Sequence, residues 1–322
     1  MKILVVGGAG YIGSHIVADL CEKNYDVSVF DNLNSGSLKN LNEKAKFIKG
    51  DINNETDLEK VFKTKFDIVF HFAALKAAGE SMEKPEIYSK NNIIGTINLL
   101  NAMMKYDVKK IIFSSSAAVY GYPEYSPVDE KHTLKPINYY GYTKKNIEDI
   151  LEWYSKLKGL KYSALRYFNA SGYDIKGRIT EREKTTANLL PIVLENAIGI
   201  RKKINVFGDD FDTKDGTGVR DYIHVNDLAD AHIKAMKYLN ENNENLILNL
   251  GTGLGYSVFD VIKMVEKISN TKINYSVVER RDGDPATLIA SSKLAKEKIG
   301  WEAKHSDLET ILSSMWELYS KI

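Results

Sequence analysis

The chain has 322 residues, of which 43% are apolar and 27% are charged, and its formal net charge is +1. These values describe a soluble globular protein with a substantial core, and a charge so close to zero argues against nucleic acid or an anionic membrane as a partner. The single cysteine, Cys21, excludes an intrachain disulfide. With a glycine-interrupted N-terminus unlike a secretory signal and no long apolar run, it predicts a cytoplasmic protein without a membrane span.

Short apolar runs rich in Val, Ile, Phe and Tyr alternate with amphipathic segments along the chain. The runs lack two-sided alternation, as strands buried on both faces do. Strands are predicted at 2–6, 26–30, 67–72, 110–115, 162–167 and 246–250, and helices near 12–23, 56–63, 85–105, 141–157 and 226–240. This order predicts an α/β fold with a Rossmann-type, doubly wound parallel sheet.

The rhythm loosens in the second half, where loops rich in Gly, Asp and Arg occur at 208–222 and 279–287. We therefore expect a main domain at 1–170 and a smaller, irregular α/β lobe at 171–322, with the segment at about 222–252 returning to the main domain. The smaller lobe is the expected place for a substrate.

A glycine-rich motif, VVGGAGYIG at 5–13, follows the first predicted strand and opens a helix. Gly7, Gly10 and Gly13 fit the places where a dinucleotide-binding chain turns tightly, meets pyrophosphate and packs helix on strand. Asp31 ends the second strand 18 residues beyond Gly13, where a carboxylate suits the ribose hydroxyls of NAD and would repel the extra phosphate of NADP. The motif predicts NAD binding; the alternative is a tight turn without a ligand.

Two further strand ends belong to the same predicted crevice. Asp51 follows the third strand and, with Ile52, fits a contact to an adenine ring, although an ordinary strand-end turn explains it equally well. HFAALKAAGES at 71–81 ends the fourth strand with small residues that would let backbone approach a cofactor. In a doubly wound sheet, the carboxyl ends of the strands form the ligand crevice.

Tyr140 and Lys144 form a candidate catalytic pair. KIIFSSSAAVYG at 110–121 predicts a strand with three serines at its carboxyl end, and Tyr140 lies at the start of the next helix, 24 residues beyond Ser116. Residues four apart share a helix face, so both side chains can point into the crevice. Two other tyrosine–lysine pairs have this spacing, but one spans a turn and the other lies a helix's length from the crevice.

These residue types suit proton transfer. Tyrosine has a pKa of about 10 and is a poor base at neutral pH. A lysine ammonium and a positively charged nicotinamide would both lower that pKa, and the Ser116 hydroxyl could relay the proton or steady an oxyanion. We expect Tyr140 to move a proton on a substrate hydroxyl while hydride goes to NAD; a tyrosine-rich surface helix is the alternative.

Nine sequence stretches follow one another over nearly the whole chain: GGAGYIGSH, DNLNSGS, GDI, HFAALKAAGESM, IIFSSSAAVYG, YYGYTK, ALRYFNASG, TGVRDYIHVNDLADAH and RRDGDPA. In these stretches the chain resembles the extended short-chain dehydrogenase/reductase family, in particular its nucleotide-sugar 4-epimerases. The resemblance implies NAD as cofactor, a UDP-sugar as substrate and a homodimer. The implied activity interconverts UDP-glucose and UDP-galactose and extends to UDP-N-acetylhexosamines.

The resemblance also implies the residues of the site. Catalysis is implied at Tyr140, Lys144 and Ser116, with no metal. Contacts to NAD are implied at Gly7, Gly10, Tyr11, Ile12, Gly13, Asp31, Asn32, Asn34, Ser35, Gly36, Asp51, Ile52, Phe72, Ala73, Ala74, Lys76, Asn91, Ser114, Tyr140, Lys144 and Phe168. Contacts to the UDP-sugar are implied at Lys76, Ser116, Ala117, Ala118, Tyr140, Asn169, Asn188, Leu189, Asn205, Val206, Phe207, Arg220, Arg281, Asp284 and Leu288.

The implied reaction is a transient oxidation at carbon 4 of the sugar. Tyr140, as phenolate, takes the proton of the 4-hydroxyl, directly or through Ser116, while carbon 4 gives hydride to NAD. The keto sugar then turns about its diphosphate and receives the hydride on its opposite face. No net redox change follows, so no external oxidant is needed.

Two arginines are expected to hold the diphosphate during that turn. The guanidinium groups of Arg220 and Arg281 suit such a ligand, and Asp284 is expected to accept hydrogen bonds from ribose hydroxyls. The alternative is that the arginines form loop salt bridges with Asp221 or Asp282.

Two positions depart from the family pattern. Ala118 stands where a threonine is common, which removes one hydrogen bond to the sugar but leaves the relay serine. Leu288 stands four residues past Asp284, where some relatives carry tyrosine. Because leucine leaves more room, we expect some tolerance for the N-acetylated sugar.

Three other functions compete with this interpretation. A 4-epimerase could act on another nucleotide sugar. A nucleotide-sugar 4,6-dehydratase would need an acid where this chain has Ala117, Ala118 and Val119. A non-catalytic NAD-binding regulator would be expected to lack Tyr140 or Lys144.

The apolar faces of the helices near 85–105 and 141–157 have two possible uses. Paired in two subunits, they could form a four-helix dimer contact; alternatively, both could be buried within one subunit.

Overall fold

The computed structural model describes residues 1–183, 188–281 and 283–321. Its strands are β1 (Lys2–Val6), β2 (Asp26–Asp31), β3 (Lys46–Lys49), β4 (Ile68–His71), β5 (Lys110–Ser116), β6 (Lys161–Tyr167), β7 (Asn169–Ser171), β8 (Ile204–Phe207), β9 (Val219–Arg220), β10 (Tyr222–His224), β11 (Leu246–Leu250), β12 (Tyr256–Ser257), β13 (Tyr275–Val278) and β14 (Thr287–Leu288). Its helices are α1 (Tyr11–Glu22), α2 (Glu55–Phe62), α3 (Ala78–Glu83), α4 (Pro85–Tyr88), α5 (Gly95–Lys105), α6 (Tyr139–Lys158), α7 (Leu189–Ala197), α8 (Val225–Asn242), α9 (Val258–Ser269), α10 (Lys293–Ile299) and α11 (Leu308–Tyr319), with short turns of other helix types at η1 (Leu38–Asn40), η2 (Ser89–Ile94) and η3 (Ala117–Val119).

Seven strands form one sheet in the order β11-β6-β5-β4-β1-β2-β3, and every neighbouring pair in it is parallel. The chain builds outward from β1 to β3, then returns to β4 and builds the other way. The doubly wound parallel sheet expected from the sequence is confirmed. The reversal between β1 and β4 is the topological switch point at which such sheets bind ligands.

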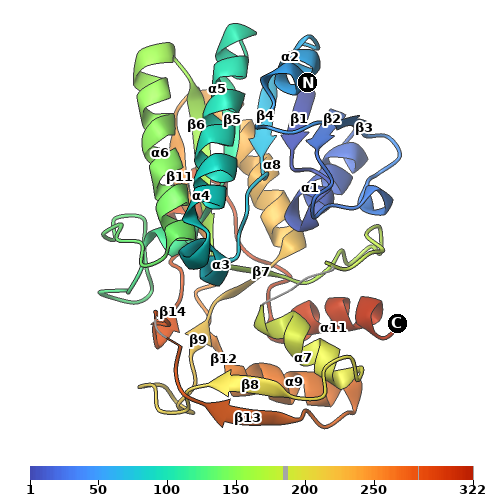
Figure 1. Cartoon of the computed structure of the whole chain (residues 1–322), viewed down its shortest axis with the longest axis vertical. Coiled ribbons are helices and arrows are strands. Elements are labelled where there is room, and N and C mark those ends of the chain that lie inside the picture. The colour runs from blue at the N-terminus through green and yellow to red at the C-terminus, as the bar shows by residue number, and fades with distance from the viewer. Residues whose placement is uncertain (184–187, 282, 322) are drawn as a thin grey trace.

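Helices cover both faces of this sheet (Figure 1). Residues of α1 and α8 pack on one face and residues of α2, α5 and α6 on the other, which forms two apolar cores. The strands read as continuous apolar runs because both of their faces are buried. Each fully buried Leu, Ile or Phe contributes about 1.5–3 kcal/mol relative to exposure, so the sheet is a rigid base for its strand ends.

The helix predicted near 85–105 is not continuous. The structure has α4, then the π-helix η2, then α5. Asn92, inside η2, is fully buried, and its side chain bonds both backbone groups of Leu75 and the Thr143 hydroxyl at 2.9–3.1 Å. A π-turn accommodates an extra residue and occurs most often at functional sites; here it directs an amide to tertiary partners that the sequence pattern does not reveal.

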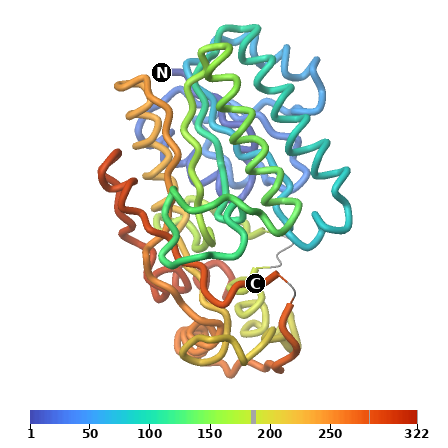
Figure 2. The backbone as a smooth tube through the Cα atoms, turned by 90° about the vertical axis from the view of Figure 1, so that its left-hand side faces the viewer, coloured from blue at the N-terminus to red at the C-terminus, as the bar shows by residue number. Residues whose placement is uncertain are grey.

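A smaller lobe lies below the carboxyl ends of the strands, as both views show (Figures 1 and 2). Strands β8 and β13 pair in parallel, and β9 lies between β12 and β14. Helices α7, α9 and α11 share a third apolar core in this region. The lobe therefore faces the edge at which the sheet would hold a ligand.

Candidate active site

The glycine loop between β1 and α1 leaves no room for side chains. Gly7 has φ +80°, and a Cβ there would lie 2.4 Å from the backbone nitrogen of Ala73. A Cβ on Gly13 would lie 2.3 Å from the Gly7 carbonyl oxygen. The N-cap residue Gly10 makes no side-chain cap hydrogen bond, so backbone amides and the helix dipole face the loop. This cradle fits a dinucleotide pyrophosphate.

Asp31 stands at the end of β2 beside this loop. It is 8% exposed, and its carboxylate accepts hydrogen bonds from the backbone amides of Ala9 at 3.0 Å and Leu33 at 2.8 Å. Burial raises the pKa of Asp31, an effect that these two amides oppose. The orientation of the Asp31 carboxylate is therefore fixed, at the position where the sequence predicts a ribose contact.

The adenine-side candidates come from two adjacent strand ends. The side-chain amide of Asn32 donates to Asp51 at 2.9 Å, and Ile52 is buried. Asn34 and Ser35 are exposed on the loop after β2. Gly36, on the same loop, packs against the glycine loop between β1 and α1, since a Cβ there would lie 2.8 Å from atoms of Ala9.

A segment at 178–183 lies against this part of the loop. Asn40 bonds the backbone of residues 180 and 181 through both atoms of its amide, at 2.8–3.1 Å. Lys39 pairs with Glu181 at 2.7 Å. Lys76 pairs with Glu183, and its ammonium lies 5.6 Å from the centroid of the Tyr11 ring. The sequence gives no signal for this Lys76–Glu183 pair, because the two residues are 107 positions apart.

The end of β4 supplies the next wall. Phe72 and Ala73 are half-buried and pack against the two cores of the sheet, and Ala74 is also half-buried. The side chain of Asn91 donates to that of Asn92 at 3.0 Å. Through Asn92, this wall is joined to the start of α6.

The structure brings Ser116, Tyr140 and Lys144 together at the ends of β5 and α6. The Ser116 side chain lies close enough to that of Tyr140 to lower its pKa, and the Ser116 hydroxyl accepts from the backbone amide of Ala118 at 3.2 Å. The Lys144 ammonium donates to the Ser114 carbonyl at 2.7 Å and lies 5.8 Å from the centroid of the Tyr140 ring. Asn138 caps the helix that carries the pair by accepting from the Gly141 amide.

Burial opposes charge on both members of the pair. It raises the pKa of Tyr140, which the Ser116 side chain lowers in part. It lowers the pKa of Lys144 to about 7, against the opposing charge of Glu148. A buried group whose pKa lies near neutrality is suited to proton transfer. The pKa of Lys144 therefore supports a catalytic role for the pair.

Sequence reasoning missed Tyr167 at this place. Its hydroxyl shares a hydrogen bond with the hydroxyl of Ser114 on the neighbouring strand β5. Burial raises its pKa far above the ordinary range, with a smaller contribution from Tyr140. Its position at the end of β6 was the available signal, because that strand end faces the same crevice.

The lower lobe places a cluster of charged side chains opposite the pair. Arg220 contacts the Asp284 carboxylate at 3.5 Å, and Arg281 contacts it at 2.9 Å. The Arg281 guanidinium also lies 4.6 Å from the centroid of the Phe207 ring. Asp284 is thus the carboxylate partner of both arginines, and its contact with ribose hydroxyls stays a prediction.

The alternative partner Asp221 is bonded elsewhere. It is fully buried, and its carboxylate accepts from the amides of Thr252, Gly253 and Ala290 at 2.9–3.1 Å. Asp282, the other proposed partner, lies outside the described residues.

Val206, one of the residues implied to contact the sugar nucleotide, turns its side chain inward. It is 1% exposed and belongs to the core of the lower lobe, whereas its neighbours Asn205 and Phe207 on β8 are exposed. Alternation along a strand turns every second side chain inward. Only the backbone of Val206 is available to a ligand.

The remaining sugar-side candidates line the space between the two parts. Asn169 begins β7, and Asn188 is the N-cap of α7, which starts at Leu189. Another group packs together beneath β5: Ala117, Phe168 and Leu288 belong to or contact the same small apolar cluster.

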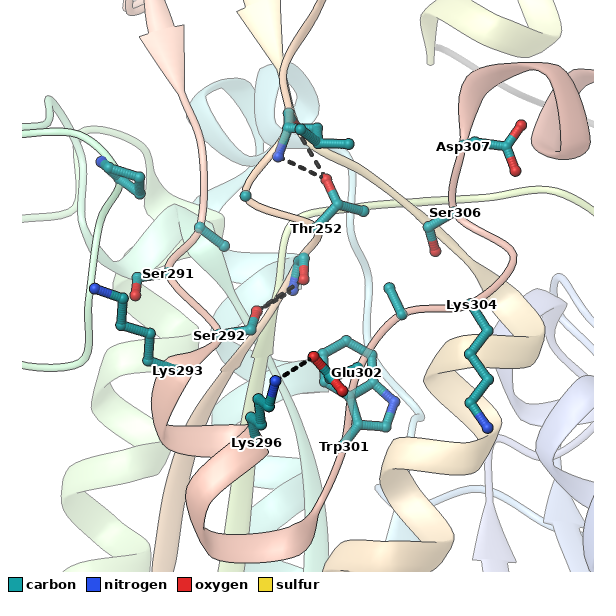
Figure 3. Close-up of a pocket in the computed structure, with 16 residues that line it drawn as sticks. Thr252, Ser291, Ser292, Lys293, Lys296, Trp301, Glu302, Lys304, Ser306 and Asp307 are labelled. Atoms are coloured by element: carbon teal, nitrogen blue, oxygen red, sulfur yellow. Dashed lines mark hydrogen bonds and ion pairs between the residues drawn. The ribbon is translucent and has the colours of Figure 1, made fainter.

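A separate cavity of about 510 Å³ lies off this crevice (Figure 3). Trp301 and residues of α10 line it together with Thr252 and Ser306. None of the side chains predicted from the sequence to touch NAD or sugar is among its lining residues. Among the described residues, no group of His, Cys, Asp and Glu is arranged to hold a metal, and no described helix combines the length and apolarity needed to cross a bilayer.

A glycine cradle at the switch point of a parallel sheet and a Tyr–Lys–Ser cluster beside it define an NAD-dependent enzyme of the short-chain dehydrogenase/reductase type. The model of the NAD dependent epimerase/dehydratase family matches residues 3–251. The chain belongs to the NAD-dependent epimerase/dehydratase family.

Individual relatives match over the full length. A UDP-glucose 4-epimerase from Lactobacillus helveticus is 45% identical over 98% of this chain and 96% of its own. The crystal structure of UDP-glucose 4-epimerase from Bifidobacterium longum in complex with NAD+ and UDP aligns with a TM-score of 0.94 and 40% identity, covering 100% of this chain and 98% of that chain. The UDP-Glc/GlcNAc 4-epimerase from Campylobacter jejuni aligns with a TM-score of 0.88 and 38% identity, covering 100% and 99%.

Proposed function

We propose that the protein interconverts UDP-glucose and UDP-galactose by NAD-dependent epimerisation at carbon 4. The observation that carries this proposal is the meeting of Ser116, Tyr140 and Lys144 at the strand ends next to the glycine cradle. The relatives that match the full chain are UDP-glucose 4-epimerases, which supports the same substrate pair.

The described residues fit an NAD molecule. Gly7 and Gly13 let the backbone of the cradle pack closely on Ala73 and on itself, because any Cβ there would clash with backbone. Asp31 is oriented toward a ribose, and Lys144 lies where it could hold the nicotinamide ribose. When bound, NAD accepts a hydride from carbon 4 of the sugar and returns it.

The protein's own side chains transfer the proton and hold the diphosphate of the substrate. Tyr140 takes the proton from the sugar 4-hydroxyl, directly or through Ser116, and returns it after the sugar has turned. Lys144 stabilises the phenolate form of Tyr140 by its positive charge. Arg220 and Arg281 hold the diphosphate while the keto sugar turns.

The proposal is tested by supplying UDP-galactose and then UDP-glucose to the purified protein without added NAD, and following the products by NMR. Each substrate should give the other sugar. Loss of water to a 4-keto-6-deoxy sugar would instead identify a dehydratase, and no turnover of either sugar, even with NAD added, would identify a non-catalytic protein. Epimerisation of a different UDP-sugar alone would retain the reaction and replace the substrate.

The size of residue 288 is expected to set tolerance for an N-acetyl group. Leu288 is half-buried and packs beside Phe168 and Ala117. We expect the native protein to turn over UDP-N-acetylglucosamine as well as UDP-glucose. Leu288→Tyr should lower kcat/KM for UDP-N-acetylglucosamine by about tenfold or more, since a volume change in a pocket is worth about 1–3 kcal/mol, and change it little for UDP-glucose.

Both sugars are measured on the same preparations. Undetectable turnover of UDP-N-acetylglucosamine by the native protein, or an equal loss for the two sugars in Leu288→Tyr, contradicts this assignment. Leu288→Met, with a similar volume, is the control.

We also propose a homodimer through the helices α4 to α6. Trp153 and Leu157 on α6 are 60% and 70% exposed, and Ile87 and Ile94 on the neighbouring segment are 45% and 50% exposed. Apolar side chains gathered in this way are typical of an interface. The exposure favours the dimer contact over burial within one subunit.

Leu157→Glu is expected to shift the protein from dimer to monomer, because it places a charge in an apolar contact. Sedimentation or light scattering measures the mass. Ile200→Glu is the matched control, since Ile200 is 49% exposed but lies away from these helices. A dimer that persists in Leu157→Glu, or dissociates equally in both variants, contradicts the proposed interface.

The division of the chain at residue 170 remains a prediction, as does a cytoplasmic location. The latter is supported by Cys21, which is buried and whose pKa burial raises.

A further inference from the structure

A buried ion pair lies one helical turn from Lys144. Glu148 on α6 and Arg166 on β6 are 4% and 3% exposed. The guanidinium donates to both oxygens of the carboxylate, through Nε at 2.9 Å and Nη2 at 2.6 Å. Such bidentate pairing is the strong form of a charge-assisted hydrogen bond. The mechanism above assigns this pair no role.

The pair is bonded to the strand that carries the catalytic serines. Ser115 donates to the Glu148 carboxylate at 2.5 Å. On either side of Ser115, the Ser114 carbonyl accepts from Lys144, and the Ser116 side chain neighbours that of Tyr140. The carboxylate of Glu148 is therefore bonded to the residue that lies between the two contacts of the catalytic pair.

The other side of Arg166 is fixed in a polar network. Its Nη1 donates to the Tyr120 hydroxyl at 3.0 Å, and that hydroxyl donates to Asn249 at 2.6 Å. Arg166 cannot turn toward solvent or toward Lys144 without breaking these bonds. The charge arrangement around Lys144 is therefore set by the fold.

Among the described residues, the titratable and charged groups linked to Lys144, directly or through one partner, come from three elements. Burial holds one of them, His71, neutral by lowering its pKa to about 3. Strand β5 contributes an uncharged ring, that of Phe113, whose centroid lies 4.9 Å from the Lys144 ammonium. The titratable and charged groups are Tyr140 and Glu148 on α6, His71 on β4, and Arg166 and Tyr167 on β6.

We propose that Glu148 is a positioning residue for the reaction: its buried negative charge keeps Lys144 protonated, and Arg166 sets how much of that charge Lys144 experiences. The proposal rests on the proposed function, in which charged Lys144 stabilises the phenolate of Tyr140. Without Glu148, the ammonium and the guanidinium would be two buried cations with no anion between them, an arrangement that a protein interior resists. Burial alone lowers the pKa of Lys144, and Glu148 opposes that shift.

Two single substitutions are expected to act in opposite directions. Glu148→Gln keeps the shape and removes the negative charge, so Lys144 loses its proton more easily. The basic limb of the pH profile of kcat/KM should move to lower pH by about one unit. Arg166→Met removes the cation and leaves Glu148 unneutralised, so the same limb should move to higher pH.

Arg166→Lys separates charge from structure. It keeps the cation but loses the bidentate fork, so a purely structural role predicts damage similar to that of Arg166→Met, whereas the electrostatic role predicts a limb near its native position. The double variant Glu148→Gln/Arg166→Met replaces the ion pair with neutral groups and should return the limb toward native. It also provides a folded test protein if one single variant is unstable, because a neutral pair is tolerated better than one buried charge.

A second measurement does not depend on turnover. In the NAD-loaded protein labelled with [ε-13C]lysine, the Lys144 resonance is identified by its loss in Lys144→Arg. Its titration midpoint should fall in Glu148→Gln and rise in Arg166→Met. Midpoints that move in the same direction, or do not move, overturn the proposal. If the native protein epimerises no sugar, the proposed function fails while these midpoints still decide the role of Glu148.

Discussion

Tyr140→Phe is expected to lower kcat for UDP-galactose about 10³-fold, within the range of 10²–10⁴ typical of a lost general base. The substitution removes one oxygen atom, the hydroxyl that neighbours the Ser116 side chain. Without it, the proton of the 4-hydroxyl has no acceptor at the strand ends, and the Ser116 hydroxyl alone is far too weak a base. The ring itself remains, so packing at the start of α6 is preserved.

The measurement is steady-state epimerisation at several pH values, with bound NAD quantified in each preparation. KM and the amount of bound NAD should change little, because the lost Tyr140 hydroxyl acts in proton transfer and not in binding. Tyr142→Phe is the matched control: Tyr142 lies on the same helix but is 46% exposed, and its variant should keep native activity. A Tyr140→Phe protein that retains more than about a tenth of native kcat contradicts the base assignment.

Arg220→Met is expected to lower kcat/KM for UDP-galactose by 10²-fold or more. Hydrogen bonds to charged groups contribute about 1.5–3 kcal/mol each, and a guanidinium makes two of them to a diphosphate. Arg220 is mostly buried, and burial lowers its pKa while Asp284 opposes that shift. A desolvated cation of this kind binds an anion more strongly than an exposed one.

Isothermal titration with UDP, with KM as the second readout, locates the loss in binding. UDP affinity should fall by the same order as kcat/KM. Arg280→Met is the control, since Arg280 is bonded to Asp210 and stacks on Phe211 at 4.1 Å and should not touch the diphosphate. Native UDP affinity in Arg220→Met would show that Arg220 does not hold the diphosphate.

The sequence predicted the strands and most helices because burial of a parallel sheet leaves an unambiguous apolar pattern. It could not predict the break in the helix near 85–105. That break depends on Asn92, which bonds Leu75 and Thr143. Local propensity contains no information on partners 17 and 51 positions away.

The candidate site, like the fold, could be predicted only in part. Tyr140 could be selected by its place after a serine-ended strand, because the carboxyl ends of parallel strands share one edge. Pairing of Arg220 with Asp284 could not be predicted, since loops 64 positions apart meet only in the folded chain. The inward direction of the Val206 side chain could not be predicted either, because a resemblance transfers a position but not the side of a strand on which its side chain lies.

The groups proposed for proton transfer all come from β5 and the first turns of α6, within 31 consecutive residues from Ser114 to Lys144. The groups proposed to hold the sugar nucleotide come largely from the lower lobe and its β-strands β8, β9 and β14. Recognition of the sugar nucleotide thus depends largely on stretches of chain outside the one proposed to move the proton. Substrate range can diverge, by selection or by loop exchange, without disturbing the machinery that moves the proton.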